Sequence, residues 1–423
     1  MNGNDYPAYA ETLRRGNYVK LARLRFLNPG GGTAFVLDND PMQKFSGAFI
    51  RSGSLTVNLQ NGARRSASVE IANADGDFDF RVNKVWFGTE IAVDMGLMLQ
   101  DGTECWFPQG VFRVARPSES VANNGTIAHF DLIDKWAGID GTLNGSLEAS
   151  YGVASGTNIF SAIAALLLLD RGDGQPFDSV TPIFTEFYNG KTQMLPGGSS
   201  APLVNTSYNL LIGNTDSSVA DVVTELCGFL QAWVGYDVNG ALRVEPSQDD
   251  LSDADKPVLW RFSTAEAQIA GRLDYEANVP EVCNDYIVTG YATGNRPPNA
   301  ARAVNLDPAS PVCVQRIGRR TIREEKPEFS TWRMCEDYAA WKVKRMAALR
   351  RAVTVMANQI FHLRENNLIE IVRTDKAGSP IERHLIQGYT LPFSGAEPMT
   401  IQAISVEDFP QITTYVESPD VVG

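Results

Sequence analysis

The sequence has 423 residues, of which 43% are hydrophobic and 21% charged, a balance typical of soluble globular proteins with several domains. Its formal net charge of −13 argues against a grip on nucleic acid or on an anionic membrane surface, since both need clustered lysine and arginine. The longest apolar run, Ile163 to Leu169, is too short to span a bilayer, and the polar segment Met1 to Ala10 indicates no secretion signal. The five cysteines are scattered without metal-binding spacing, so we expect reduced thiols in a protein that folds in cytosol.

The first 45 residues predict an arm of two strands. An apolar-rich, basic stretch runs from Tyr18 to Leu27, and the loop-forming run Pro29 to Gly32 follows it. Thr33 to Leu37 then returns as a strand. We expect this arm to add edge strands to the first β region or to reach a neighbouring subunit.

Three β-hairpins are predicted between Gly47 and Asp134. Apolar and polar residues alternate from Ser54 to Leu59, which places one face of a strand in a core. Similar segments recur around turn signals that tolerate positive backbone φ angles, namely Asn61-Gly62, Asp101-Gly102 and Asn124-Gly125. Hairpins at this regular spacing indicate an antiparallel sandwich or barrel.

The second region changes to a helical period. Apolar residues recur at helical spacing from Asn158 to Asp170, with Thr157 as the expected N-cap, and again from Val219 to Trp233. Residues 171–214 are rich in loop signals, and a hairpin is predicted over residues 234–244. Helices followed by a hairpin describe a small α+β insert.

The third region returns to strands. Tyr286 to Tyr291 is rich in β-branched and aromatic residues, residues 295–311 are expected to form a loop, and Phe329 to Arg351 is the strongest helix signal in the sequence. The tail from Phe409 is expected to be loose. Further strands are predicted over residues 353–361, 368–373, 384–390 and 399–406. Two β regions thus flank an α+β insert.

Motifs that would carry catalysis or cofactor binding fail their templates. Gly190-Lys191-Thr192 lacks the earlier glycine of a phosphate-binding loop, and Ala201 stands where a nucleophile elbow around Ser199 needs glycine. Each histidine falls in an expected strand and lacks the spacing of metal-ligand pairs. We therefore expect no catalytic residue, no cofactor and no metal. The histidines concerned are His129, His362 and His384.

Three other patterns have a structural and a functional interpretation. Asp75, Asp77 and Asp79 alternate as in a calcium loop, but the glutamate expected six residues after Gly76 is missing, so a turn is the simpler interpretation. A basic cluster is either a solvated helix face or a surface that pairs with acidic residues of a neighbouring subunit. Tryptophans fit core positions, or stacking faces for sugars. The basic cluster comprises Lys342, Lys344, Arg345, Arg350 and Arg351, and the tryptophans of interest are Trp106 and Trp136.

The order of these elements resembles the baseplate or tail-tip hub proteins of tailed bacteriophages. Short motifs carry the resemblance: Ile71-Ala72-Asn73-Ala74-Asp75-Gly76, Trp86-Phe87-Gly88 with Ile91 and Val93, Phe107-Pro108-x-Gly110-x-Phe112-x-Val114, and Asp131-x-x-Asp134. The remainder is similar as an arrangement, with a helical insert and a second β region that a long helix interrupts.

The resemblance implies a mainly β fold with two antiparallel, barrel-like or sandwich-like tube domains, residues 1–145 and 262–408. These would flank an α+β insert of residues 146–261, with a long helix at 329–351 and a tail at 409–423. It also implies a homotrimer without enzymatic activity, in which a ring of subunits continues the tail tube and leaves a channel for DNA.

The same resemblance implies a set of partners. Besides copies of itself, the chain would contact a distal tail or tube ring protein, the tape measure protein and a central spike or fibre protein. It would belong to a virion assembled in the host cytoplasm, meet DNA only in transit, and bind no membrane stably.

Other functions stay open on the sequence. A distal tail ring would be a hexamer instead of a trimer. A carbohydrate-binding host-attachment module would present Trp106 or Trp136 to a glycan, and a hydrolase would use Ser199 or the three aspartates near Gly76.

Overall fold

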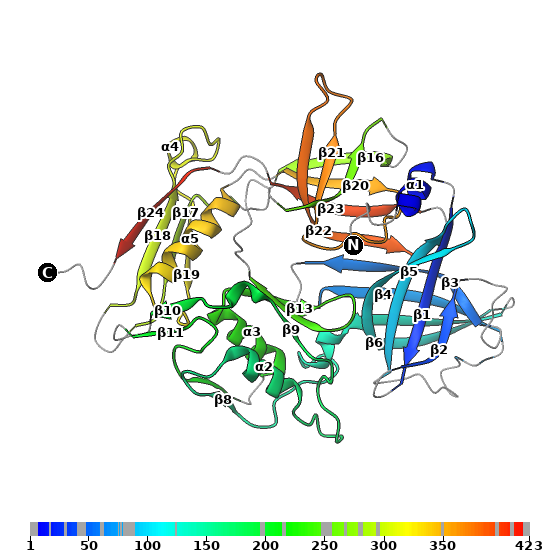
Figure 1. Ribbon diagram of the computed structural model, residues 1–423, viewed down its shortest axis with the longest axis horizontal. Coiled ribbons are helices and arrows are strands. Elements are labelled where there is room, and N and C mark those ends of the chain that lie inside the picture. The colour runs from blue at the N-terminus through cyan, green and yellow to red at the C-terminus, as the bar shows by residue number, and fades with distance from the viewer. Residues whose placement is uncertain are drawn as a thin grey trace.

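The protein is mainly β, with strands gathered into one long sheet and several small ones (Figure 1). The computed structural model describes residues 7–16, 18–28, 32–39, 48–59, 63–74, 76, 78, 89–122, 125–194, 199–213, 217–246, 256–265, 269–277, 282–292, 297–347, 351–393, 397–406 and 410–417. This mainly β fold with a smaller α+β part confirms the fold class predicted from the sequence. Among the described helices, none is long and apolar enough to cross a membrane.

The long sheet combines strands from both β regions. Its path runs β16-β20-β23-β22-β3-β4-β7-β6-β5-β1-β2, and β21, with β15 beside it, pairs with β22 off this path. The strands of the first region are β1 (Val19–Leu27), β2 (Thr33–Asp38), β3 (Ala48–Asn58), β4 (Arg65–Asn73), β5 (Glu90–Met98), β6 (Glu104–Ala122) and β7 (Gly125–Asp134). Those of the third region are β15 (Val258–Ser263), β16 (Ile269–Ala277), β20 (Arg351–Ala357), β21 (Leu368–Val372), β22 (Ile381–Pro392) and β23 (Met399–Ser405).

The three predicted hairpins are confirmed. β3 pairs with β4, β5 with β6, and β6 with β7, each antiparallel. Alternate residues of these strands face one apolar core, which also takes in side chains of β20, β22 and β23. Burial of alternate apolar side chains is what fixes the register of such strands, because a slip of one residue would turn the apolar set to solvent.

The N-terminal arm is confirmed as two strands added at the end of the sheet, with an additional helix before them. β1 pairs with β5, and β2 is the last strand of the path. Helix α1 (Pro7–Arg15) was not expected, because it is short and its surroundings are polar. Tyr9 and Leu13, four residues apart on one helix face, are each only 1% exposed and anchor it on the core of the long sheet.

The insert has its own core between two helices and small sheets. Asn158 caps α2 through its side chain, where Thr157 had been expected, and Ser218 caps α3 with a capping box to Asp221. Helix α3 ends at Phe229, and the residues after it form the predicted hairpin. The elements are η2 (Lys135–Gly138), β8 (Tyr151–Val153), α2 (Ile159–Leu167), β9 (Ile183–Phe184), η3 (Glu186–Tyr188), β10 (Thr192–Met194), β11 (Ser200–Pro202), β12 (Leu210–Ile212), α3 (Val219–Phe229), β13 (Ala232–Tyr236) and β14 (Leu242–Pro246).

A separate four-stranded sheet, β19-β17-β18-β24, lies beside the insert, and one long helix covers one of its faces (Figure 1). Residues 295–311 were expected to be a loop, yet six of them form β18. The tail was expected to be loose, yet it supplies the edge strand β24. The elements are β17 (Asp285–Thr289), β18 (Ala300–Asn305), α4 (Val314–Ile317), β19 (Thr321–Glu325), α5 (Trp332–Met346) and β24 (Ile412–Glu417).

The predicted helix of residues 329–351 is confirmed as α5 but is shorter at both ends. Thr331 caps it by accepting a hydrogen bond from the Met334 amide, so the preceding residues cannot continue the helix. Its buried stripe of Cys335, Ala339 and Val343 packs against β17 and β18, as the alternating three- and four-residue spacing indicated.

Candidate functional site: an uncharged sheet face and the polar junction beside it

On one face of the long sheet, the five strands β20, β23, β22, β3 and β4 carry mostly short hydroxyl side chains. Apolar residues point into the core, and the alternate residues point the other way. On that opposite face, Thr400 lies beside Thr390, Thr390 beside Thr56, and Thr56 beside Ser66. We name this strip the hydroxyl face; its members are Thr354, Met356, Thr400, Gln402, Gly388, Thr390, Ser54, Thr56, Ser66 and Ser68.

The hydroxyl face contains no charged residue, although Thr56, Ser66 and Ser68 are exposed. Water-facing surfaces ordinarily carry about 25–35% lysine, arginine, glutamate and aspartate. A strip across five strands without any of them is therefore unusual for a surface that meets only solvent. Most of its side chains are short and offer hydroxyl groups, and none is a cation or an anion.

Charge returns on the same face at both ends of the strip. On β16, Arg272 stands opposite Met356 and Asp274 opposite Thr354, and these two residues form an ion pair; at the other end, charged residues appear on β4, β7 and β6. His129 Nδ1 lies 3.6 Å from Glu70 Oε1, and the Ser52 hydroxyl donates to Glu70. Asp131 stands opposite Arg116 in the register of β7 and β6. Each charged end therefore contains both signs, set close enough to balance one another.

Strand β22 makes the face continuous across the two β regions. Its first part, up to Leu385, pairs with β21, and its last part, from Gly388, pairs with β3. A Cβ on Gly388 would lie 2.5 Å from the carbonyl oxygen of Val57, so the close approach of β22 to β3 requires glycine here. The Thr56 and Thr390 hydroxyl oxygens are 3.4 Å apart across this seam.

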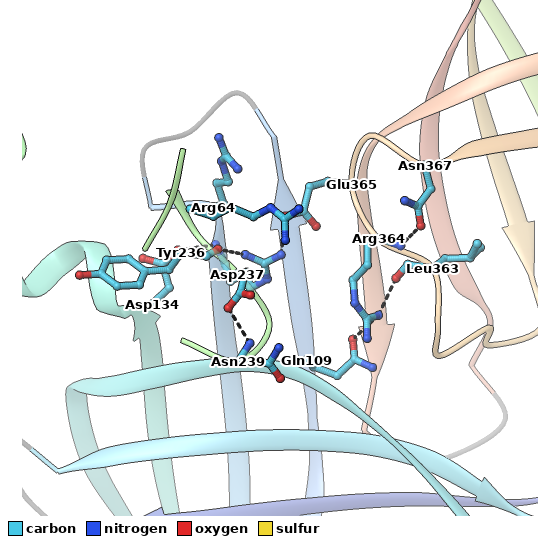
Figure 2. Close-up of polar contacts among 12 residues, drawn as sticks. Arg64, Gln109, Asp134, Tyr236, Asp237, Asn239, Leu363, Arg364, Glu365 and Asn367 are labelled. Atoms are coloured by element: carbon cyan, nitrogen blue, oxygen red, sulfur yellow. Dashed lines mark hydrogen bonds and ion pairs between the residues drawn. The ribbon is translucent and has the colours of Figure 1, made fainter. Parts of the chain in front are cut away.

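Beside the seam lies a buried polar junction that joins three parts of the chain (Figure 2). Arg65, at the start of β4, is 2% exposed. Its guanidinium forms an ion pair with Glu365, from the loop before β21, and donates to the backbone carbonyl of Tyr236 in the insert. Burial alone would raise the pKa of Glu365, but Arg65 holds that pKa below its ordinary value.

Neighbouring contacts repeat this three-way arrangement (Figure 2). Arg64 Nη2 donates to the carbonyl of Val234 in β13 over 3.1 Å. Gln109 Nε2, in β6, donates to the carbonyl of Phe361 over 2.9 Å, and Arg364 Nη2 returns a bond to the carbonyl of Pro108 over 2.7 Å. Arginine and glutamine side chains thus satisfy backbone carbonyls where no regular ladder can reach them.

Asp134 and Lys135 fix the entry to the insert. Asp134 accepts from the backbone amides of Arg65 at 3.1 Å and Trp136 at 2.9 Å, and burial raises its pKa to about 6. Lys135 Nζ donates to Asp178 at 2.6 Å, and both side chains are almost fully buried. These contacts connect the start of β4, the end of β7 and the insert.

The predicted basic cluster is only partly brought together. Lys342 lies over the rings of Tyr338 and Trp341, and Arg345 lies over Trp341 at 5.0 Å from the ring centre. Burial lowers the pKa of Lys342. Lys344 is exposed on the same helix. Arg351 belongs to β20, a different element, and Arg350 lies outside the described residues.

The residues considered for other activities are dispersed. His362 lies in the loop after β20, instead of in a strand, because β20 already ends at Ala357. Trp136 is buried in the insert core, which removes it as a stacking face for sugars, and Trp106 is half-buried beneath the Arg23 guanidinium. Ser199 precedes the small β11 strand. The aspartates 75, 77 and 79 lie outside the described residues.

Within the part of the chain that the structure describes, no group of three histidine, cysteine or acidic residues is placed to hold a metal ion. Sequence reasoning missed the hydroxyl face and the polar junction. The hydroxyl face had a signal, since serine and threonine alternate with apolar residues in Ser54 to Val57 and in Ser66 to Val69. The junction had none, because Arg64-Arg65 has the appearance of an ordinary basic surface pair.

Comparison with known proteins identifies the fold. No family model matches the sequence, and no curated protein sequence matches it. A tail protein from Neisseria meningitidis has a TM-score of 0.57 at 10% identity, covering 92% of this chain and 97% of that one. The 43 kDa tail protein of prophage MuSo2 from Shewanella oneidensis gives 0.54 at 10% identity, covering 95% and 99%.

A third crystal structure, the prophage tail protein gp18 from Listeria monocytogenes, gives a TM-score of 0.52 at 7% identity, covering 91% of this chain and 94% of that one. The class defined by these structures is that of phage and prophage tail proteins. This chain has their fold over nearly its whole length, so the resemblance noted in the sequence is confirmed for the fold.

Proposed function

We propose that this chain is a structural subunit of a phage tail tip, a trimeric hub that joins the tail tube to a distal spike or receptor-binding component. Two tube-like domains, residues 1–145 and 262–408, would form the ring wall, and the insert of residues 146–261 would stand beside it. The hub would contact the tail tube ring, the tape measure protein and the spike within the virion. The hub would assemble with these proteins and let DNA pass through its ring, without catalysing a reaction.

The observation that carries this proposal is the hydroxyl face. It extends without interruption from the strands of the third region into those of the first, because β22 pairs with β3. A ring built from copies of such a sheet would have a wall with an uncharged strip along its middle strands. Short neutral side chains suit a wall that a polyanion must pass without stopping.

The charge distribution supports the same interpretation. Proteins that bind DNA neutralise its phosphates with lysine and arginine, and each such contact increases the affinity. The hydroxyl face has neither residue, and the chain as a whole carries a net charge of −13. Passing DNA would therefore meet weak repulsion and no anchoring cation.

Oligomeric state tests the proposal. Native mass spectrometry of the purified full chain should find three copies. Six copies would instead support a distal tail ring, and a lone monomer at high concentration, absent from intact virus particles, would refute both.

A second experiment tests the passage. Virions that carry Thr56→Lys with Ser68→Lys should assemble normally but deliver DNA poorly, because two cations would stand on the wall. The matched control is Thr142→Lys with Ser150→Lys, which adds the same charge at exposed positions where the insert begins. Equal DNA delivery by both double variants would refute the placement of the hydroxyl face on the wall of the channel.

A further inference from the structure

The four-stranded sheet and the helix that covers it form a unit with a core of its own. We name β17, β18, β19, β24 and α5 the four-stranded unit. Its buried apolar side chains form a cluster separate from the cores of the insert and of the long sheet. Among the described elements, these strands pair only with one another, and neither they nor α5 pack extensively on the insert or the long sheet. The unit therefore packs mainly on itself, although it lies beside the insert (Figure 1).

A stacked aromatic pair joins the four-stranded unit to the insert. Tyr208, just before β12, lies nearly parallel to Tyr291, just after β17, with the ring centres 5.5 Å apart and an angle of 9° between the ring planes. Tyr208 also contacts Phe229, the last residue of α3, with 4.9 Å between the ring centres. Both tyrosines are partly exposed, so water reaches the rings as soon as they separate. A stacked pair of this kind gives a modest attraction that depends on its geometry.

An acidic side chain at the same contact opposes docking. Glu328, in the segment between β19 and α5, is 6% exposed and lies against α3, where a Cβ on Gly228 would be 3.2 Å from the Oε1 atom of Glu328. Burial, together with the charge of Glu225 on α3, raises the pKa of Glu328, although Lys326 Nζ lies 3.7 Å from the Glu328 carboxylate. The charged form of Glu328 therefore costs free energy while α3 covers it, and separation from the insert would return it to water.

We propose that the four-stranded unit moves as one body relative to the insert, between a docked state that the Tyr208–Tyr291 stack holds together and a separated state in which Glu328 is hydrated. Contacts between domains of one chain allow relative motion unless they are large and apolar. This contact combines one aromatic pair with a nearly buried acid, so an attraction and a penalty act against each other across it. The motion belongs to a single copy of the chain and does not depend on the proposed trimer.

Two spin labels measure this motion in the purified full chain. Ser161→Cys on α2 and Arg333→Cys on α5 place one label on each side of the contact, both at exposed positions. Cys105→Ser removes the native thiol that is not buried. Pulsed electron spin resonance then gives the distribution of distances between the labels, with unlabelled copies in excess so that only distances within one copy contribute. We expect a docked population and a second population at longer distance.

Substitutions at the contact should shift the two populations in opposite directions. Tyr291→Ala removes the stack and should raise the ratio of separated to docked molecules roughly fivefold. Glu328→Gln removes the charge that docking buries and should lower that ratio. The matched controls change the same residue types at exposed positions of the unit, Tyr415→Ala on β24 and Glu325→Gln at the end of β19, and should leave the ratio unchanged. Circular dichroism checks that each variant is folded.

The outcomes distinguish motion from a fixed arrangement. A single distance that neither contact variant changes overturns the proposal. A shift towards longer distance in Glu328→Gln also overturns it, because the acid would then hold the unit in place instead of opposing docking. Equal shifts in Tyr291→Ala and Tyr415→Ala overturn the role of the stack. If Tyr291→Ala does not fold, Tyr291→Leu takes its place, since it keeps apolar volume but removes the stacked ring. All of these results are independent of the number of copies that native mass spectrometry finds.

Discussion

Neutralising one partner of the Arg65–Glu365 ion pair should destabilise the protein far more than breaking a surface pair. Glu365→Gln keeps the shape of the side chain but leaves the Arg65 guanidinium, 2% exposed, without its counter-charge. Opposite charges about 4 Å apart attract by about 4 kcal/mol at an effective dielectric constant near 20. Removing one partner of a buried pair costs about 3–5 kcal/mol, because the remaining charge has lost both water and its partner.

Urea unfolding followed by tryptophan fluorescence measures this loss, and Trp136 lies close to the junction as a reporter. The control is Asp274→Asn, which breaks the exposed pair with Arg272 and should change the unfolding free energy by less than about 1 kcal/mol. The double variant Arg65→Met with Glu365→Met removes both charges and should recover most of the lost stability. A Glu365→Gln protein that unfolds at the same urea concentration as the Asp274→Asn protein would refute the reasoning.

Three further predictions concern acid and packing. Burial lowers the pKa of His362 to about 4, below its unfolded value of 6.5. The stability that neutral His362 contributes is therefore lost as pH falls from about 6.5 to 4. His362→Gln should reduce this loss of unfolding free energy by about 3 kcal/mol, measured by urea unfolding at several pH values. Asp134 acts in the opposite sense: its folded pKa of about 6 exceeds the unfolded value of 3.8, so its contribution is present below pH 3.8 and lost as pH rises through 6. Asp134→Asn should therefore abolish a gain of roughly 2 kcal/mol on acidification, seen as a difference from wild type between pH 6.5 and 4. Gly96→Ala should lower the melting temperature clearly, because its Cβ would lie 1.8 Å from the Cys105 carbonyl oxygen, whereas Gly213→Ala, with no atom within 4 Å, should leave it nearly unchanged.

Local signals predicted the hairpins well because turn and alternation lie within a few residues of each other. Asn124-Gly125 is an example, since β6 and β7 pair directly up to Ala122 and Gly125. The β22–β3 seam had no such signal. Its partners, Gly388 and Asn58, are 330 positions apart, and nothing in either segment specifies the other. Pairing over such a distance is decided by the packed core and not by local propensity.

Two elements were missed for identifiable reasons. Ala300 to Asn305 contains only one of the β-branched and aromatic residues that mark strands, Val304, yet it forms β18 because the small Ala301 and Ala303 side chains fit beneath α5. The basic pair Arg64-Arg65 follows the turn signal Asn61-Gly62, where solvated charge is the rule, and only the assembled fold supplies Glu365 and the carbonyls that justify its burial.

The late pairing of β22 has a consequence for synthesis on the ribosome. Residue 388 emerges 330 residues after residue 58, which at about 5–20 residues per second is a delay of roughly 15 to 65 seconds. During that interval the edge of β3 that will pair with β22 has no partner strand. Its backbone amide and carbonyl groups can then form hydrogen bonds with an extended segment of another nascent chain. A chain that terminates before β22 would leave this edge of β3 permanently unpaired. Translation must therefore reach β22 before the nascent protein is protected against aggregation with other copies of itself.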